Sequence, residues 1–317
     1  MLKTKIKNTF LLWLSVILIM VAAQIAVFLM QKSEIVIIAE TKAQPQVLGD
    51  ITYIRGPAVQ NDLNQTLQKT SLPDLKNVKA TSYLVFDLES GQDFLQKNIE
   101  KKLSIASLTK LMTGLIAYEQ SDLNQYITIT QADNVEIKPS LGLKYSDKVK
   151  AIDVFNAMLI GSTNDGALAL AHFASGSTVD FVKLMNQEAE KLGMENSRFS
   201  NPIGFDSNQN YSSANDLKKL VSVTENLAAF KVLGKRLSYE FSGSLNQTYR
   251  TEATNKLIAS YPDLEAIKTG YTANARGVMA TKLNAFNRQI IILVLDSPDR
   301  ESDTLELRKA ILENFSP

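Results

Sequence analysis

A serine and a lysine stand three residues apart in the segment SIASLTKLMT, residues 104–113. Positions i and i+3 of a helix share one face, about 5–6 Å apart, so a helical segment places the hydroxyl of Ser107 beside the amine of Lys110. A lysine that is shielded from water and close to another cation has a lowered pKa, and its neutral amine can act as a base toward the serine. The ordinary interpretation is a helix-capping serine followed by a lysine that reaches solvent.

The composition leaves few other routes to nucleophilic catalysis. The chain has no cysteine, which excludes a thiol nucleophile, a disulfide and a thiolate zinc site. Its one histidine, His172, lies in the apolar run ALALAHFAS, where a packed or partly exposed side chain is expected rather than a member of a triad. A zinc site of the H-E-x-x-H kind needs two histidines. We find no arrangement of metal ligands in the sequence and predict no cofactor.

Two further motifs suit the same chemistry. The residues Ser162-Thr163-Asn164 follow a glycine at a break between two apolar helical segments, and alone they fit a capping box. The sequence Lys268-Thr269-Gly270 lies on an expected strand, and alone it fits an edge strand with a solubilising lysine. S-x-N also occurs at 213–215 and 244–246, but only the copy at 162–164 lies at a corner between helices. The three motifs together predict one site.

The elements that must position these motifs follow from periodicity. Strands are expected at 81–88 and 93–98, and after Ala106 apolar residues recur with the helical period. Further helices are expected at 152–160, 164–175, 178–192, 214–232 and 301–315. Three more strands are expected at 267–272, 276–283 and 288–296, the last with six consecutive aliphatic residues that suit burial on both faces.

The order of these elements predicts the fold class. Strands at both ends of the domain and helices in the middle are typical of an α+β fold. We expect the first and last strands to pair in one antiparallel sheet, and the closing helix to turn Leu305, Ile311, Leu312 and Phe315 inward. The middle helices would form a second lobe, with a cleft between the lobe and the sheet where sites tend to form.

The N-terminus predicts a membrane anchor. Residues 10–30 carry no charge and follow three lysines, and as a helix they would span about 32 Å, enough for a bilayer core. The lysines predict a cytoplasmic tail at 1–9. A tether is expected at 31–78 and the catalytic domain at 79–317, outside the cytoplasm. A cleaved signal peptide is the alternative, although its apolar region is usually shorter, about 7–15 residues.

The three motifs in this order resemble the signature of penicillin-binding proteins and serine β-lactamases. Five segments are similar to the low-molecular-mass D-alanyl-D-alanine carboxypeptidases: IASLTKLMT, NPIGFD at 201–206, YSSANDL at 211–217, TNKL at 254–257 and IKTGYT. The similarity covers about residues 80–315. It implies a β-lactamase/DD-peptidase-like fold, with an antiparallel sheet flanked by helices and a mostly helical lobe. It also implies a bacterial membrane enzyme that removes the terminal D-alanine from peptidoglycan stem pentapeptides, with β-lactams as inhibitors.

The resemblance also implies a role for each matching residue. Ser107 is similar to the acylated nucleophile and Lys110 to its base. Ser162 resembles the hydroxyl that relays a proton to the leaving group, and Asn164 the amide that contacts the substrate backbone. Lys268 resembles the cation that keeps the pKa of Lys110 low. Thr269 and Gly270 resemble the strand that binds the terminal carboxylate. The backbone N–H groups of Ser107 and Tyr271 are implied to bind the oxyanion.

The sequence departs from the family pattern in two places. Thr163 stands where relatives more often have glycine. The larger side chain is expected to narrow the corner between the helices but not to abolish activity. The chain ends soon after the expected closing helix, where many relatives continue into a β-domain and a membrane helix. The N-terminal segment is therefore expected to supply the membrane attachment.

Other functions remain open at this point. A class A β-lactamase would need a glutamate in an E-x-x-L-N sequence, and none occurs between 165 and 267, so slow deacylation of penicillin is expected. A D,D-endopeptidase of cross-links uses the same chemistry. A non-catalytic wall-binding protein would not need the intact motifs. A net charge of +1 and the absence of a basic stripe argue against a nucleic-acid partner.

Overall fold

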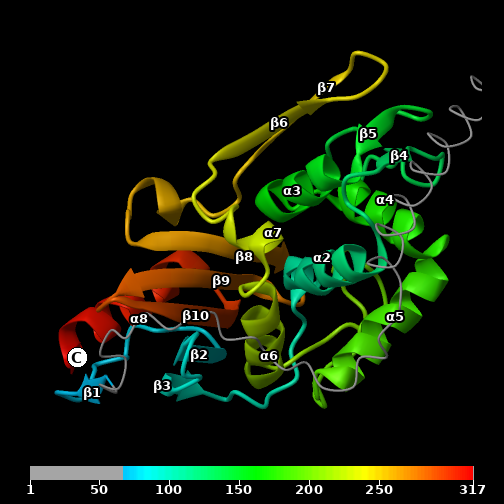
Figure 1. Ribbon diagram of the computed structural model, residues 1–317. Coiled ribbons are helices and arrows are strands. Elements are labelled where there is room, and N and C mark those ends of the chain that lie inside the picture. The colour runs from blue at the N-terminus through cyan, green and yellow to red at the C-terminus, as the bar shows by residue number, and fades with distance from the viewer. Residues whose placement is uncertain (1–66, 317) are drawn as a thin grey trace, which may run out of the picture. The chain divides into compact units, whose positions relative to one another are not determined.

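Five antiparallel strands form the central sheet of the structure, a computed structural model that describes residues 67–316 (Figure 1). Their order across the sheet is β3-β2-β10-β9-β8. The bounds are Ser82–Asp87 for β2, Asp93–Lys97 for β3, Leu264–Thr272 for β8, Arg276–Ala285 for β9 and Arg288–Ser297 for β10. Strands β2 and β10 pair directly, with Leu84 opposite Leu293. This confirms the predicted pairing of the first and last strands and the α+β fold class.

The aliphatic run of β10 is buried on both faces, as the sequence predicted. Alternate side chains of a strand point to opposite faces, and here they enter two different cores. Ile292 packs in the core beneath α8 (Arg300–Asn314), which covers one face of the sheet. Leu293 packs in the larger core shared with the other helices. The sheet is therefore held between α8 and a helical lobe.

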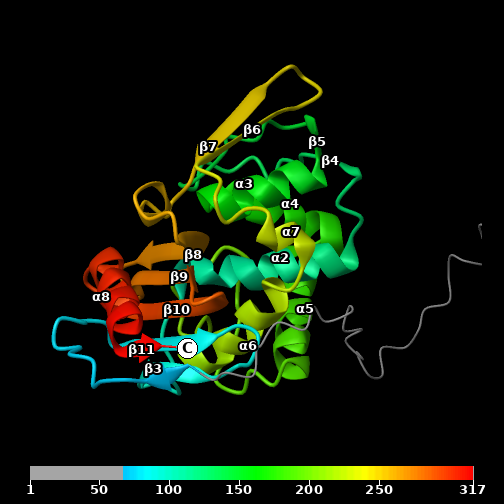
Figure 2. The same cartoon turned by 60° about the vertical axis from the view of Figure 1, so that its left-hand side comes forward.

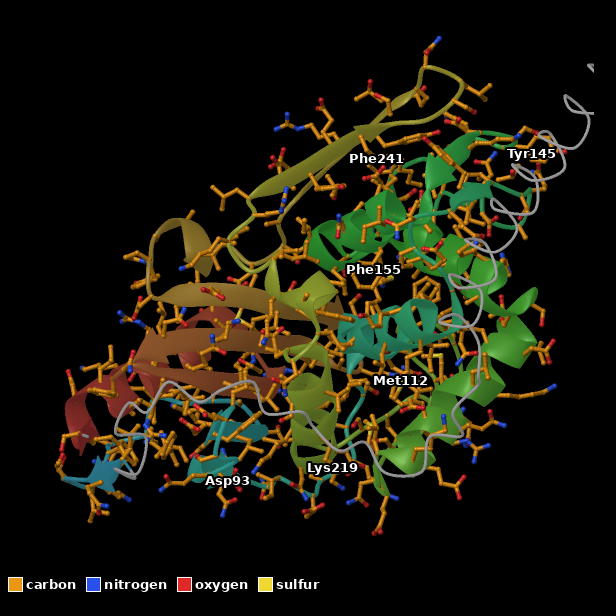
Figure 3. The ribbon with its side chains drawn as sticks, viewed as in Figure 1. Asp93, Met112, Tyr145, Phe155, Lys219 and Phe241 are labelled. Carbon is orange, nitrogen blue, oxygen red and sulfur yellow. The ribbon has the colours of Figure 1, made fainter. Side chains whose placement is uncertain are left out.

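The helices between β3 and β8 form that second lobe beside the sheet (Figures 1 and 2). Their bounds are Thr109–Gln120 for α2, Ala151–Gly161 for α3, Asn164–Ser175 for α4, Thr178–Lys191 for α5, Ala214–Thr224 for α6 and Ala228–Lys231 for α7. Helix α2 contacts α3, α4, α5 and α6. The side chains of Met112 and Phe155 are fully buried within the lobe (Figure 3). Because α2 is enclosed by other helices, it holds a fixed position for residues at its start.

Two small ribbons were not predicted from the sequence. Strands β4 (Tyr126–Thr128) and β5 (Lys148–Lys150) form one, and β6 (Ser238–Ser242) and β7 (Thr248–Glu252) form a hairpin beside α3. The hairpin is anchored by the buried carboxylate of Asp147, which accepts hydrogen bonds from Ser244 Oγ (2.9 Å), Leu245 N (3.0 Å) and Tyr249 OH (2.7 Å). Phe241 and Tyr249 of the hairpin also pack in the larger core, so long-range contacts rather than a core of its own fix the hairpin.

Two expectations about helices were wrong in detail. The single helix expected at 214–232 is interrupted after Thr224, where the Glu225 carboxylate turns inward to bind Lys282 (2.9 Å). In the closing helix, Leu312 is 37% exposed rather than inward-facing, while Ile311 is fully buried. The helical pattern identified both segments but not the local break or the orientation of every side chain.

The folded body also includes the last part of the segment assigned to the tether. Strand β1 (Gln68–Lys69) pairs with β11 (Phe315–Ser316), and Leu67 and Val78 are buried. The tail at 1–9, the membrane segment at 10–30 and the tether up to residue 66 lie outside the described residues. Among residues 67–316, no helix has the length and apolar character needed to cross a membrane.

Candidate active site

Ser107 lies in a short 3₁₀ turn, η1 (Ala106–Leu108), directly before α2. The preceding residue, Ala106, has a φ of 44°, a left-handed conformation that carries strain in a residue with a side chain. Two glycines enclose this turn. A Cβ atom at Gly204 would lie 1.9 Å from the carbonyl oxygen of Ala106, and one at Gly270 would lie 2.6 Å from the amide nitrogen of Ser107. The loop at 201–206 and strand β8 therefore close directly on the backbone of Ser107.

Lys110 is one helical turn further along and is fully buried. Its Nζ atom lies 3.1 Å from Ser107 Oγ, 2.7 Å from Asn164 Oδ1 and 2.6 Å from the carbonyl oxygen of Ile203. Burial lowers the pKa of Lys110 to about 7, although the carboxylate of Asp165 opposes the shift. Of the two causes expected from the sequence, burial dominates rather than the charge of a neighbouring lysine.

The second motif forms the corner between α3 and α4. Ser162 ends α3 with a φ of 60° and is 4% exposed, and its hydroxyl forms no hydrogen bond with any residue of the described part. Asn164 begins α4, and its Oδ1 atom accepts the bond from Lys110. Its Nδ2 atom donates to the carbonyl oxygens of Ile137 (3.2 Å) and Lys138 (3.0 Å). The structure thus joins Ser107, Lys110 and Asn164 directly, while Ser162 lies at the same corner as Asn164 without a hydrogen bond to the three.

The capping box considered for this corner is not formed. Thr163 is the N-cap of α4, yet its hydroxyl is buried without a partner in the described part of the chain. The carboxylate of Asp165 instead accepts hydrogen bonds from Ser140 Oγ (2.8 Å), Leu141 N (3.0 Å) and Leu143 N (3.1 Å). Asp165 therefore organises the loop that lies against the start of α4.

The third motif lies on β8, at the end of the sheet order. Lys268 is 2% exposed, and its Nζ atom donates to the carbonyl oxygen of Thr269 (2.9 Å). Burial, followed by the charges of Lys110 and Arg300, holds the pKa of Lys268 well below its usual range. Thr269 Oγ1 donates to Thr254 Oγ1 at 2.6 Å. The side chain of Tyr271 is 71% exposed.

Two of these neighbours had no assigned role in the sequence analysis. Arg300, at the start of α8, donates from Nη1 to the carbonyl oxygen of Gly270 (2.7 Å). Thr254 belongs to the TNKL segment, which the sequence analysis noted without giving it a function. A small pocket lies where β8 meets α3 and α7, and its lining includes Leu159, Thr254 and Thr269. The pocket lies between the sheet and the helical lobe, where a cleft was expected.

The geometry suits acyl transfer to a hydroxyl. A buried amine with a pKa near 7 can accept a proton at neutral pH, and it lies within hydrogen-bond distance of Ser107. The guanidinium of Arg300 lies beside β8, where a carboxylate would find positive charge. A substrate that ends in a carboxylate and carries a reactive carbonyl nearby therefore fits these groups.

Sequence comparison finds a family match over most of the folded body. The profile of a family described as D-alanyl-D-alanine carboxypeptidase matches residues 66–299. D-alanyl-D-alanine carboxypeptidase DacF of Bacillus subtilis is 28% identical over 251 residues, which cover 75% of this chain and 62% of DacF. A D-alanyl-D-alanine endopeptidase of Escherichia coli is 28% identical over 228 residues, covering 69% of this chain and 72% of that protein.

Solved structures with the same fold include peptidases of two bacteria. The Streptomyces K15 DD-transpeptidase superposes with a TM-score of 0.68 at 26% identity, covering 74% of this chain and 97% of that one. A D-alanyl-D-alanine carboxypeptidase from Mycobacterium tuberculosis gives a TM-score of 0.71 at 24% identity, covering 77% and 94% of the two chains. The match covers 62% of the length of DacF and 57% of the length of DacC of Escherichia coli, so this chain spans only part of the length of these relatives.

Proposed function

Because the chain belongs to the D-alanyl-D-alanine carboxypeptidase family, we propose that it removes the terminal D-alanine from peptidoglycan stem pentapeptides through an acyl-enzyme on Ser107. The observation that carries this proposal is the contact between Lys110 Nζ and Ser107 Oγ at 3.1 Å, made by a lysine whose burial lowers its pKa to about 7. A lysine with this pKa is neutral in a large fraction of molecules at physiological pH and can take the serine proton.

In the proposed reaction, Ser107 attacks the carbonyl carbon between the two terminal D-alanines while its proton passes to Lys110. The negative charge on the carbonyl oxygen is stabilised by the backbone N–H groups of Ser107 and Tyr271; losing one such donor typically costs about 3–4 kcal/mol of barrier. Ser162 passes a proton to the leaving D-alanine. Water then hydrolyses the acyl-enzyme, with Lys110 again as the base.

The substrate is held by groups on both sides of the serine. Lys268 and Thr269 offer hydrogen-bond donors to the terminal carboxylate, and Arg300, which donates to the carbonyl oxygen of Gly270, supplies positive charge beside β8. Asn164 orients the acyl part of the peptide. Both of its amide hydrogens are engaged by the carbonyl oxygens of Ile137 and Lys138, so substrate binding would require one of these two bonds to open.

Covalent labelling tests the nucleophile. After incubation with benzylpenicillin, intact-protein mass spectrometry is expected to find one adduct per chain, and Ser107→Ala is expected to give none while keeping the same unfolding temperature. The small change removes only a partly exposed hydroxyl, so folding should survive it. An adduct of equal yield on the folded variant would remove Ser107 from the proposed role.

A second candidate activity is cleavage of cross-links, because relatives described as D-alanyl-D-alanine endopeptidases are similar to this chain at 27–28% identity. Both activities use the same acyl-enzyme. Purified protein given a pentapeptide and a cross-linked dimer separates them: release of free D-alanine supports the carboxypeptidase, and cleavage of the dimer alone supports the endopeptidase.

We also propose that residues 10–30 anchor the enzyme in the bacterial membrane with its catalytic domain outside the cytoplasm. The support is the uncharged run and the preceding lysines. Gel mobility of the mature protein tests the anchor, since loss of about 3 kDa would indicate a cleaved signal peptide instead.

A further inference from the structure

A carboxylate clamps the two segments that enclose Ser107. The Asp206 Oδ1 atom accepts a hydrogen bond from Thr272 Oγ1 (2.6 Å), and its Oδ2 atom accepts one from the backbone N–H of Asn274 (3.1 Å). Asp206 ends the loop that contains Gly204, and Thr272 ends β8, which contains Gly270. Asp206 therefore lies beside the end of the strand along which the substrate is proposed to bind.

The charge of Asp206 is not neutralised by a cation. Within residues 67–316, no lysine, arginine or histidine nitrogen lies within 4.0 Å of its carboxylate. Asp206 is exposed, and the neighbouring Phe205 is 43% exposed although it is a large apolar side chain. An anion beside an open apolar surface is suited to an alkyl chain that ends in a positive charge.

The direction of the bound peptide follows from the roles proposed above. The terminal carboxylate lies at Lys268 and Thr269, and the scissile carbonyl lies at the N–H of Tyr271. The peptide therefore runs antiparallel to β8, with each residue advancing about 3.3 Å. The residue before the two D-alanines then lies near Thr272, whose hydroxyl is bonded to Asp206.

We propose that Asp206, with the apolar surface of Phe205, binds the side-chain ammonium of the residue that precedes the two terminal D-alanines. This inference rests on the proposed function and adds a substrate class to it. The cleft has a cationic end at Arg300, which donates to the carbonyl oxygen of Gly270, and an anionic end at Asp206. A stem peptide with a free side-chain amine carries the complementary charges at both positions.

The same contact would discriminate against cross-linked stems. In a cross-link the side-chain amine is acylated, so it carries no charge and cannot form a charge-assisted hydrogen bond to a carboxylate. The enzyme would then prefer uncross-linked pentapeptides, whose amine is still free. This preference would separate the chain from an enzyme that acts equally on free and acylated stems.

Two peptides test the inference: Nα-acetyl-L-lysyl-D-alanyl-D-alanine, with a free side-chain amine, and its Nα,Nε-diacetyl form. Release of D-alanine gives kcat/KM for each. For the native enzyme we expect about a tenfold preference for the free amine, the size of one hydrogen bond between charged groups. In Asp206→Asn the ratio should fall to about one. Added salt should also lower the native ratio, because the contact is exposed.

Two controls separate recognition of the amine from other effects of the substitution at Asp206. Glu313→Gln removes the same charge from an exposed position on α8 and should keep the native ratio. Acylation by benzylpenicillin, which has no amine, reports any damage that Asp206→Asn does to Ser107 itself. Equal rates for the two peptides in the native enzyme, or an unchanged ratio in Asp206→Asn, would overturn the inference and leave the proposed function standing. No D-alanine from either peptide would overturn the function.

Discussion

At the residue scale, the proposed chemistry depends on one buried amine, that of Lys110. Full burial favours the neutral form of Lys110, whereas the carboxylate of Asp165 favours the charged form. The balance brings the pKa of Lys110 to about 7. Lys268 is also buried, and repulsion from Lys110 adds to the lowering of its pKa.

The pH dependence of acylation follows from this balance. A lysine is neutral above its pKa, so Lys110 can act as a base only as the pH rises through about 7. The second-order rate constant for acylation by benzylpenicillin, measured from pH 5 to 9, is expected to rise through this range and then level off. Lys110→Arg should abolish acylation at every pH, because a guanidinium does not lose its proton. A flat profile for the native enzyme would contradict the assignment of Lys110 as the base.

At the element scale, the site is made by a loop and a strand that approach one turn closely. Gly204, with a φ of +89°, and Gly270 both leave no room for a Cβ atom against the backbone of residues 106 and 107. The same loop supplies the carbonyl oxygen of Ile203 to Lys110. The position of Ser107, the proposed nucleophile, is therefore set by backbone packing as well as by α2.

Gly204→Ala tests this packing against a matched control. Gly91 also has a positive φ, +71°, but a Cβ atom there would contact nothing within 4 Å. Gly91→Ala should cost about 1–2 kcal/mol of stability for the left-handed backbone and leave acylation unchanged. Gly204→Ala must also displace the turn that bears Ser107, and acylation by benzylpenicillin should fall about 100-fold, as expected for a misplacement near 1 Å. Similar acylation rates in the two variants would show that the close approach is not needed.

The sequence predicted the elements better than the contacts between them. Period and composition located the strand β10 and the helix α2, because burial on one or two faces leaves a local pattern. The bond from Lys110 to Ile203 joins residues 93 apart, and the bond from Arg300 to Gly270 joins residues 30 apart. No local pattern encodes such contacts, so the sequence pointed to the segment 201–206 without its contact to Lys110, and Arg300 was missed. For the same reason the sequence did not show that full burial, rather than a neighbouring cation, dominates the lowering of the pKa of Lys110.

At the scale of the whole molecule, a buried ionic group joins the helical lobe to the sheet. Lys282 on β9 lies 2.9 Å from the carboxylates of both Glu225, which ends α6, and Glu265 on β8. Burial raises the pKa of Glu225, although Lys282 opposes the shift. Burial lowers the pKa of Lys282, but the two carboxylates outweigh it and the net shift is upward. The lobe and the sheet carry the motifs of the site, so this contact helps to hold the motifs in one arrangement.

Lys282→Met should therefore be strongly destabilising. It leaves two carboxylates close together, with the side chain of Glu225 only 5% exposed, and breaking a buried ion pair in this way costs about 3–5 kcal/mol. Without Lys282, the pKa of Glu225 in the folded state lies further above its unfolded value. A raised carboxyl pKa contributes stability below the unfolded pKa that is lost as the pH rises through the folded pKa. The free energy of unfolding of the variant, measured in urea, should therefore fall from pH 4.5 to 8 relative to the native protein.

Lys309→Met, at a side chain that is 62% exposed, is the control and should change stability by less than about 0.5 kcal/mol. A loss for Lys282→Met that matched this control, or that did not change with pH, would show that the buried group does not hold the two parts together.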